Sequence, residues 1–98
     1  MTVKIQAPFQ VDGYFKSLIE DKAQRFRFLL DKVTTVSFFI REEEKRHFHC
    51  EGKKVEIQCN VPGTELFASG TAMTFEVALA DAYEKMRTQL KRYKEKAA

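Results

Sequence analysis

The chain has 98 residues, a length that suits one compact domain and excludes two. Hydrophobic residues make up 44% of it, which excludes disorder over most of the chain, and the net charge of +3 favours a local basic patch over a diffuse basic coat. No apolar run approaches the roughly 20 residues of a membrane span, and the first residues, MTVKIQAPF, lack the apolar segment of a signal peptide. We therefore expect a cytoplasmic protein whose Cys50 and Cys59 are reduced thiols.

The first part of the chain predicts a strand followed by a helix. Residues 3–7 alternate apolar and polar side chains, which is typical of a strand, and Pro8 should end it. Asp12 is a candidate N-cap for a helix that continues through residues 14–33. The apolar residues of this run recur with helical period: Phe15, Leu18, Ile19, Phe26, Leu29, Leu30 and Val33.

Lys22 falls inside this apolar stripe by its angle around the helix. A buried ammonium group would be costly, so we expect its charge to reach solvent at the edge of the helix. Arg25 follows one turn later, and the two residues indicate a basic spot beside the stripe. Ordinary solvated surface charge is the alternative interpretation of the pair.

Three strand patterns follow this helix. Residues 34–41 are rich in β-branched and aromatic side chains, and residues 53–61 alternate cleanly between apolar and polar. The charged segment 42–52 between them predicts a solvated loop. Residues 62–64, Pro-Gly-Thr, predict a short hairpin loop before a last strand over 65–70. On the outer face of the sheet we expect Ser37, Phe39, Arg41, Glu56, Gln58, Asn60 and Phe67.

The segment 74–96 predicts one long amphipathic helix. Thr74 is a candidate N-cap, and Glu76 lies in the first turn, where the helix dipole favours an anion. The apolar residues share one side: Phe75, Leu79, Ala82, Met86, Leu90 and Tyr93. The basic residues form two rows beside that seam, which are Arg87, Lys91 and Lys94, and Lys85, Arg92 and Lys96. The rows predict a surface for an acidic partner, and a solvated basic helix end is the alternative.

The element order is therefore β-α-β-β-β-α, which predicts an α+β fold. We expect a single domain over residues 1–98, with a basic tail at about 91–98. A right-handed crossover through the first helix makes the first two strands parallel, and hairpins make the rest of the four-stranded mixed sheet antiparallel. The two helices, each with one apolar stripe, should pack on one face of the sheet and leave the other face solvated.

The sequence lacks the motifs that indicate catalysis. It has no GxSxG elbow, no glycine-rich phosphate loop and no HExxH pattern. His47, His49 and Cys50 lie close together but lack the paired ligand spacing of a structural zinc site. Cys59 is most simply a small core residue. We therefore expect no enzyme activity, no metal and no cofactor.

A resemblance to a known family rests on three stretches, which are VEIQCNVPGTELFAS, TFEVALADAYEKMRTQLKRYKEK, and IEDKAQRF with the DKV that follows. Together they resemble the ribosome hibernation promoting factor family, also called ribosome-associated inhibitor, ribosomal subunit interface protein or sigma-54 modulation protein. The resemblance covers nearly the whole chain. No single motif in it is a fingerprint of the family. Its specificity comes from the order and spacing of the three stretches together with the length of the chain.

The resemblance implies a domain that binds the small ribosomal subunit. It would occupy the mRNA channel and the A and P sites of tRNA, and so silence idle ribosomes in stationary phase or stress. Basic residues of both helices would contact 16S rRNA phosphates. The family's basic positions fall on Lys22 and Arg25 in the first helix, and on Lys85, Arg87, Lys91, Arg92 and Lys94 in the last. Gln89 matches the glutamine of the family's Gln-Leu pair.

The chain departs from the family pattern at two points, and two other functions are alternatives. Thr88 stands where the family often has arginine, and Arg87 would supply that charge from an adjacent row. The end at Ala98 leads us to expect the short type, which would need a separate factor to pair ribosomes. The alternatives are a generic double-stranded RNA-binding module and a protein–protein interaction domain that uses Phe39 and Phe67.

Overall fold

The computed structural model describes residues 1–42 and 52–97. The elements are β1 (Thr2–Gln6), α1 (Gly13–Leu29), β2 (Thr35–Glu42), β3 (Lys53–Val61), β4 (Thr64–Ala72) and α2 (Phe75–Ala97). This order confirms the predicted β-α-β-β-β-α arrangement. The loop predicted over 42–52, and with it His47, His49 and Cys50, lies almost wholly outside the described residues.

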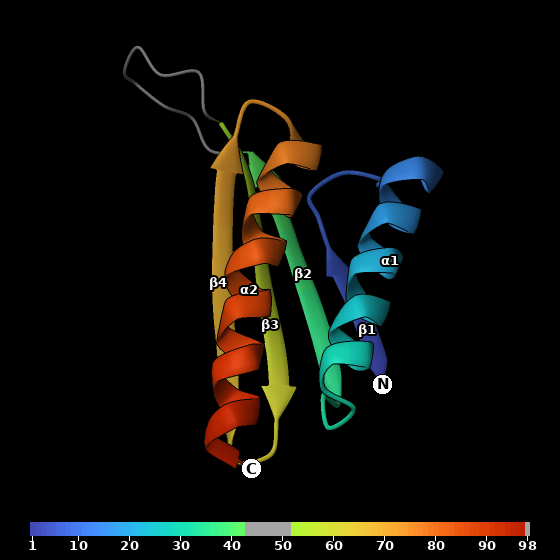
Figure 1. The fold of residues 1–98 in the computed structure, drawn as a ribbon. Coiled ribbons are helices and arrows are strands. Elements are labelled where there is room, and N and C mark those ends of the chain that lie inside the picture. Colours follow the sequence, from blue (N-terminus) through green and yellow to red (C-terminus); the bar gives the residue numbers. More distant parts are fainter. Residues whose placement is uncertain (43–51, 98) are drawn as a thin grey trace.

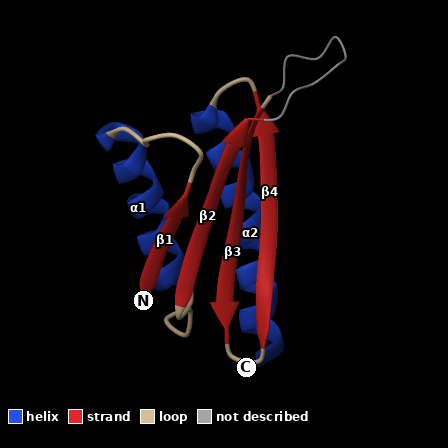
Figure 2. Cartoon of the chain, turned by 180° about the vertical axis from the view of Figure 1, so that it is seen from behind, coloured by secondary structure: helices blue, strands red, loops and turns tan. Residues whose placement is uncertain are grey.

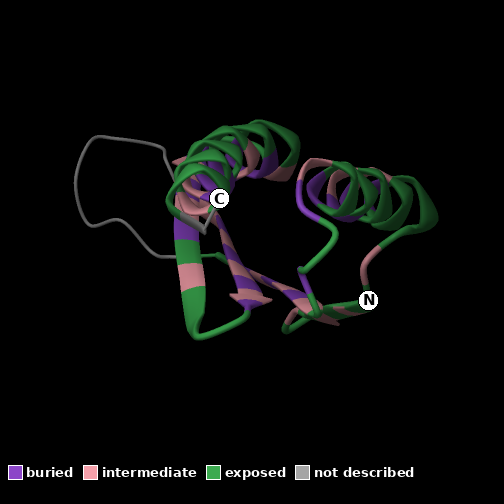
Figure 3. Ribbon diagram, turned by 60° about the horizontal axis from the view of Figure 1, so that its bottom comes forward, coloured by how far each residue is buried: buried purple, intermediate pink, exposed green. Residues whose placement is uncertain are grey.

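The four strands form one mixed sheet in the order β1-β2-β3-β4 (Figure 1). β1 pairs with β2 in parallel, whereas β2–β3 and β3–β4 are antiparallel. Both helices lie on the same face of the sheet (Figures 1 and 3). The α+β class, the mixed sheet and the one-sided helical layer are therefore as the sequence predicts.

The opposite face of the sheet carries no helix of the described chain (Figure 2). Its side chains are half-buried or exposed, and Phe67 has 58% of its surface accessible. Phe39 lies on this face between polar neighbours, as predicted. The alternation of burial along β2 and β3 confirms the expected division between core and outer residues.

The core lies between the sheet and the two helices. Its helical side consists of Phe15, Ile19, Ala23 and Phe26 from α1, and of Ala78, Leu79, Ala82, Met86 and Leu90 from α2. These residues recur at three- and four-residue steps, so each helix presents one continuous apolar stripe to the sheet. Both helix starts are capped as predicted: Asp12 Oδ1 accepts a hydrogen bond from the Phe15 N–H at 2.8 Å, and Thr74 Oγ1 accepts one from the Val77 N–H at 3.2 Å.

Gly70 sets how closely α2 approaches β4. A Cβ atom at this position would lie 2.3 Å from the Ala78 carbonyl oxygen and 2.8 Å from the Ala82 N. Both contacts are with helix backbone, which cannot move aside as a flexible side chain could. Small residues on both elements therefore let α2 pack directly against the last strand.

Two predicted boundaries are wrong. α1 ends at Leu29, because Leu30 is extended (φ −148°, ψ 106°) and the chain turns before β2. Leu30 and Val33 are buried, as their place in the apolar pattern suggested, but they reach the core from the turn and not from the helix. β4 is longer than predicted, since Thr64 pairs with Val61 directly across a two-residue turn at Pro62 and Gly63.

Candidate nucleic-acid interface

The eight side chains predicted to contact RNA fall into three groups. The helix-pair group comprises Lys22, Arg25 and Arg87, of which the first two lie on α1 and the third on α2. The edge pair comprises Lys85 and Gln89, which reach over the outer edge of β4. The terminal cluster comprises Lys91, Arg92 and Lys94, in the last turns of α2.

Within the helix-pair group, Lys22 lies against α2. Its Nζ is 4.8 Å from the centroid of the Tyr83 ring, a cation–π distance. Tyr83 also stacks on Phe26 of α1, with ring centroids 5.1 Å apart and planes inclined by 26°. Lys22 is half-buried and reaches solvent beside the tyrosine, as predicted for an ammonium group inside an apolar stripe. Because Arg87 lies one turn after Tyr83, it falls on the same side of α2.

Three of the predicted cations pair with carboxylates on their own helix. Arg25 Nε is 3.0 Å from Asp21 Oδ2, and Lys85 Nζ is 3.0 Å from Asp81 Oδ2, both at i,i+4 spacing. The Arg87 guanidinium is 3.8 Å from Glu84 Oε2. All six side chains are largely exposed, and such pairs contribute only about 0.2–1 kcal/mol. A phosphate could therefore compete for these cations at small cost.

The edge pair is bonded to the backbone of β4. Lys85 Nζ donates a hydrogen bond to the Ser69 carbonyl oxygen at 3.1 Å, and Gln89 Nε2 donates one to the Phe67 carbonyl oxygen. β4 is the last strand of the sheet, so carbonyls on its outer side have no strand partner. The edge pair satisfies two of them. The sequence does not predict this role, because it depends on where the edge strand lies after folding.

The terminal cluster is different, because none of its three side chains makes a hydrogen bond or ion pair with residues 1–42 or 52–97. All three are exposed. The helix beneath them is held in place, since Tyr93 Oη donates a hydrogen bond to the Pro62 carbonyl oxygen at 2.8 Å. This bond ties the last turns of α2 to the β3–β4 turn. The cations thus project from an anchored helix and not from a loose tail.

Within the described ranges, the structure contains no group of three or more side chains suited to hold a metal ion. No helix of those ranges has the length and apolar character needed to cross a membrane. Burial raises the pKa of the Cys59 thiol to about 12, so it stays protonated and unreactive at neutral pH.

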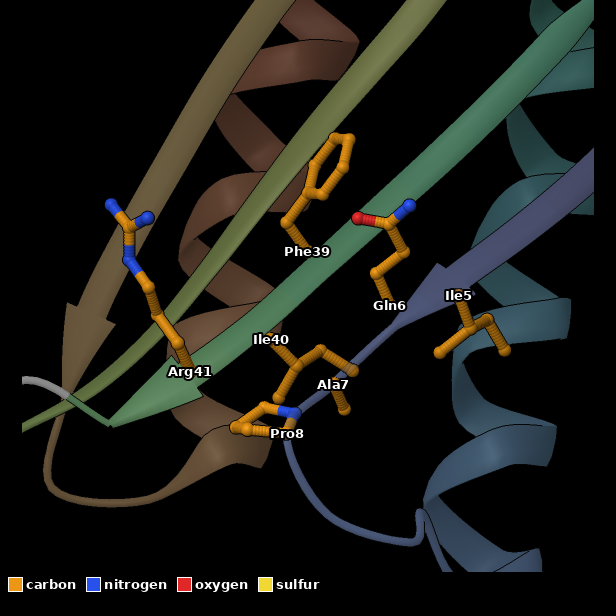
Figure 4. Close-up of a pocket in the computed structure, with 7 residues that line it drawn as sticks. All are labelled: Ile5, Gln6, Ala7, Pro8, Phe39, Ile40 and Arg41. Atoms are coloured by element: carbon orange, nitrogen blue, oxygen red, sulfur yellow. The ribbon is translucent and has the colours of Figure 1, made fainter.

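A shallow hollow of about 580 Å³ lies where β1 and β2 end (Figure 4). Gln6, Phe39 and Arg41 line its outer side (Figure 4). Arg41, its one charged residue, pairs with Glu56 at 2.6 Å. The lining residues are Ile5, Gln6, Ala7, Pro8, Phe39, Ile40 and Arg41, which include no nucleophile and no general base.

These features define a small α+β domain with a cationic helical surface. The sequence model of the family described as "Sigma 54 modulation protein / S30EA ribosomal protein" matches residues 3–98. The chain belongs to this family, which confirms the predicted relationship to the hibernation promoting factors. Membership places it among ribosome-associated factors and not in a known enzyme family.

The fold is similar to that of solved structures, of which two serve as examples. One is a ribosomal subunit interface protein from Coxiella burnetii, with a TM-score of 0.81 and 18% identity over 97% of this chain and 99% of that one. The other is the N-terminal domain of Protein Y from Thermus thermophilus, with a TM-score of 0.73 and 16% identity over 94% of each chain. Among curated protein sequences, none matches this chain.

Proposed function

We propose that this protein is a hibernation factor that docks on the small ribosomal subunit and inhibits translation in stationary phase or stress. Its helices contact 16S rRNA phosphates, and its body fills the space that mRNA and tRNA need. The observation that carries the proposal is the terminal cluster, three exposed cations without partners in the described chain, on a helix anchored by Tyr93. The name of one structural neighbour, a ribosomal subunit interface protein, agrees with an action at the ribosome.

The eight residues would not contribute equally to RNA binding. The terminal cluster can meet phosphates without breaking any bond within the described protein. In the helix-pair group, Lys22 would leave its contact with the Tyr83 ring. Arg25 and Arg87 would each exchange a weak exposed ion pair for a phosphate contact. Lys85 and Gln89 would have to leave the β4 carbonyls, so we assign them a supporting role.

Inhibition by this mechanism needs no chemistry, because a bound domain excludes mRNA and tRNA by its volume. Phosphate contacts position a protein without reading sequence, so the choice of site would come from the fit of shape and charge inside the ribosomal channel. A protein that acts in this way works in the cytoplasm, where ribosomes are.

A double charge reversal tests the proposal. Lys91→Glu with Arg92→Glu should abolish co-sedimentation with isolated small subunits, because two attractive charges become repulsive at an exposed surface. The matched control is Lys4→Glu with Lys16→Glu, which makes the same change in net charge at two exposed sites away from the terminal cluster. The control should bind like the wild type.

Two results would contradict the proposal. One is unchanged co-sedimentation of the Lys91→Glu, Arg92→Glu variant while its circular dichroism stays native. The other is equal affinity of the wild type for small subunits and for a plain RNA duplex, which would favour a general double-stranded RNA-binding module.

A further inference from the structure

Phe28 is the most exposed large apolar side chain in the described part of the chain, with 90% of its surface accessible. It lies in the last turn of α1, and Phe26, two residues earlier, is fully buried. Residues two apart point to nearly opposite sides of a helix, so Phe28 faces away from the core. Its ring therefore adds nothing to the packing of the sheet and helices.

Singly exposed apolar residues are common, so the setting of Phe28 matters more than its exposure. The ring borders a shallow hollow of about 370 Å³ lined by Gln24, Arg27, Phe28 and Asp31. This volume lies near the lower end of the range of ligand pockets, about 300–1,000 Å³. None of the three polar side chains makes a hydrogen bond or ion pair with the rest of the described chain. Their donors and acceptors are free for a ligand.

The chemistry of the hollow fits one unpaired nucleobase. An aromatic face stacks on any base, and exposed bases in RNA are recognised by such stacking together with hydrogen bonds to their edges. The Gln24 amide both donates and accepts, the Asp31 carboxylate accepts, and the Arg27 guanidinium suits a phosphate. A protein partner fits less well, because protein interfaces are centred on buried apolar clusters and Phe28 has only polar neighbours here.

The hollow adjoins the candidate interface at one residue, Arg25. Arg25 lies three residues before Phe28, so the two side chains are neighbours on the helix surface. The last turns of α1 and α2 lie at the same end of the molecule (Figures 1 and 2). An RNA strand that contacts Arg25 could therefore place a base on Phe28.

We propose that Phe28 is a stacking platform for one unpaired base of the RNA that the basic helices contact. Gln24 and Asp31 would lie at the edge of the base and Arg27 at its phosphate. The inference rests on the proposed function, to which it adds a contact that carries no charge and favours single-stranded over duplex RNA.

The test measures the affinity of Phe28 variants for isolated small ribosomal subunits over a range of salt concentrations. Phe28→Ala should weaken binding by roughly 5- to 150-fold, the effect of losing one stacked base. Phe28→Tyr should bind like the wild type, whereas Phe28→Leu, which keeps apolar volume but lacks a π-face, should be weakened like the alanine variant. Because no charge changes, the dependence of log K on log salt should keep the wild-type slope in all three variants.

Tyr14→Ala is the matched control, since Tyr14 is a 69% exposed aromatic residue at the other end of the same helix, and it should leave binding unchanged. If Phe28→Ala binds like the wild type, the stacking inference is wrong and the proposed function stands. If Phe28→Leu retains full affinity while Phe28→Ala loses it, the contact is with an apolar protein surface and the inference is again wrong. If the wild type itself does not bind small subunits, the proposed function is wrong, and the stacking inference that rests on it is wrong as well.

Discussion

The edge pair and the terminal cluster lie on the same helix, within about three turns of each other, yet their side chains have different partners. Lys85 and Gln89 donate to carbonyls of β4, and Lys85 also pairs with Asp81. Lys91, Arg92 and Lys94 have no such partner within residues 1–42 and 52–97. The first region thus holds α2 to the edge of the sheet, and the second is available to an anion.

The difference shows that positive charge in a sequence does not by itself indicate a binding surface. What decides is whether a cation is already bonded inside the protein, since a bonded donor must give up that contact before it can bind a phosphate. Variants in the two regions therefore distinguish effects on the free energy of unfolding from effects on RNA affinity. Edge-pair variants should affect mainly stability, and terminal-cluster variants should affect mainly RNA affinity.

The largest expected effect on stability comes from moving the whole helix. Gly70→Ala would place a Cβ atom against the backbone of α2 at Ala78 and Ala82 and displace both regions together. We expect the free energy of unfolding to fall by about 1–3 kcal/mol, the usual cost of overpacking. Urea denaturation followed by circular dichroism measures it.

Gly13→Ala is the control for this change, because a Cβ atom there has no neighbour within 4 Å. Its unfolding midpoint should stay close to that of the wild type. Equal midpoints for Gly70→Ala and Gly13→Ala would show that α2 does not approach β4 as closely as described.

A smaller effect is expected from the edge pair. Lys85→Met with Gln89→Leu removes two hydrogen bonds to β4 while keeping most of the side-chain volume. The free energy of unfolding should fall by about 1 kcal/mol or less, since each bond is exposed and a typical one contributes roughly 0.5–1.5 kcal/mol. The same denaturation experiment measures it. A terminal-cluster variant that is destabilised as much as the edge-pair variant would remove the distinction between the two regions.

Much of the fold follows from local patterns in the sequence. Richness in β-branched and aromatic residues predicted β2 almost to the residue, and alternation predicted β3. The three- and four-residue steps identified the apolar stripes of both helices. The caps at Asp12 and Thr74 were also predictable, because their side chains satisfy N–H groups that every helix start leaves free.

The wrong boundaries have two causes. A buried turn can show the same apolar spacing as a helix, and pairing with a neighbouring strand can extend a strand beyond the residues that its composition predicts. Leu30 and Val33 fit the helical spacing but are buried by a turn, which periodicity alone cannot distinguish from a helix. The sequence pattern assigns Thr64 to the turn and ends the last strand at Gly70. Thr64, Thr71 and Ala72 nevertheless belong to β4, because β3 offers them backbone partners. The bonds of Lys85 and Gln89 to β4 join residues 16 and 22 positions apart and appear only in three dimensions.

The most direct test of the central claim is the salt dependence of binding to isolated small subunits for the wild type and two variants. For the terminal-cluster variant, with Lys91, Arg92 and Lys94 each replaced by Gln, the slope of log K against log salt should become shallower by roughly 2–3, because three phosphate contacts are lost. For Lys85→Met with Gln89→Leu the slope should change by less than about one unit. An unchanged slope in the terminal-cluster variant would contradict the account. So would an equal decrease of the slope in the terminal-cluster variant and in the edge-pair variant.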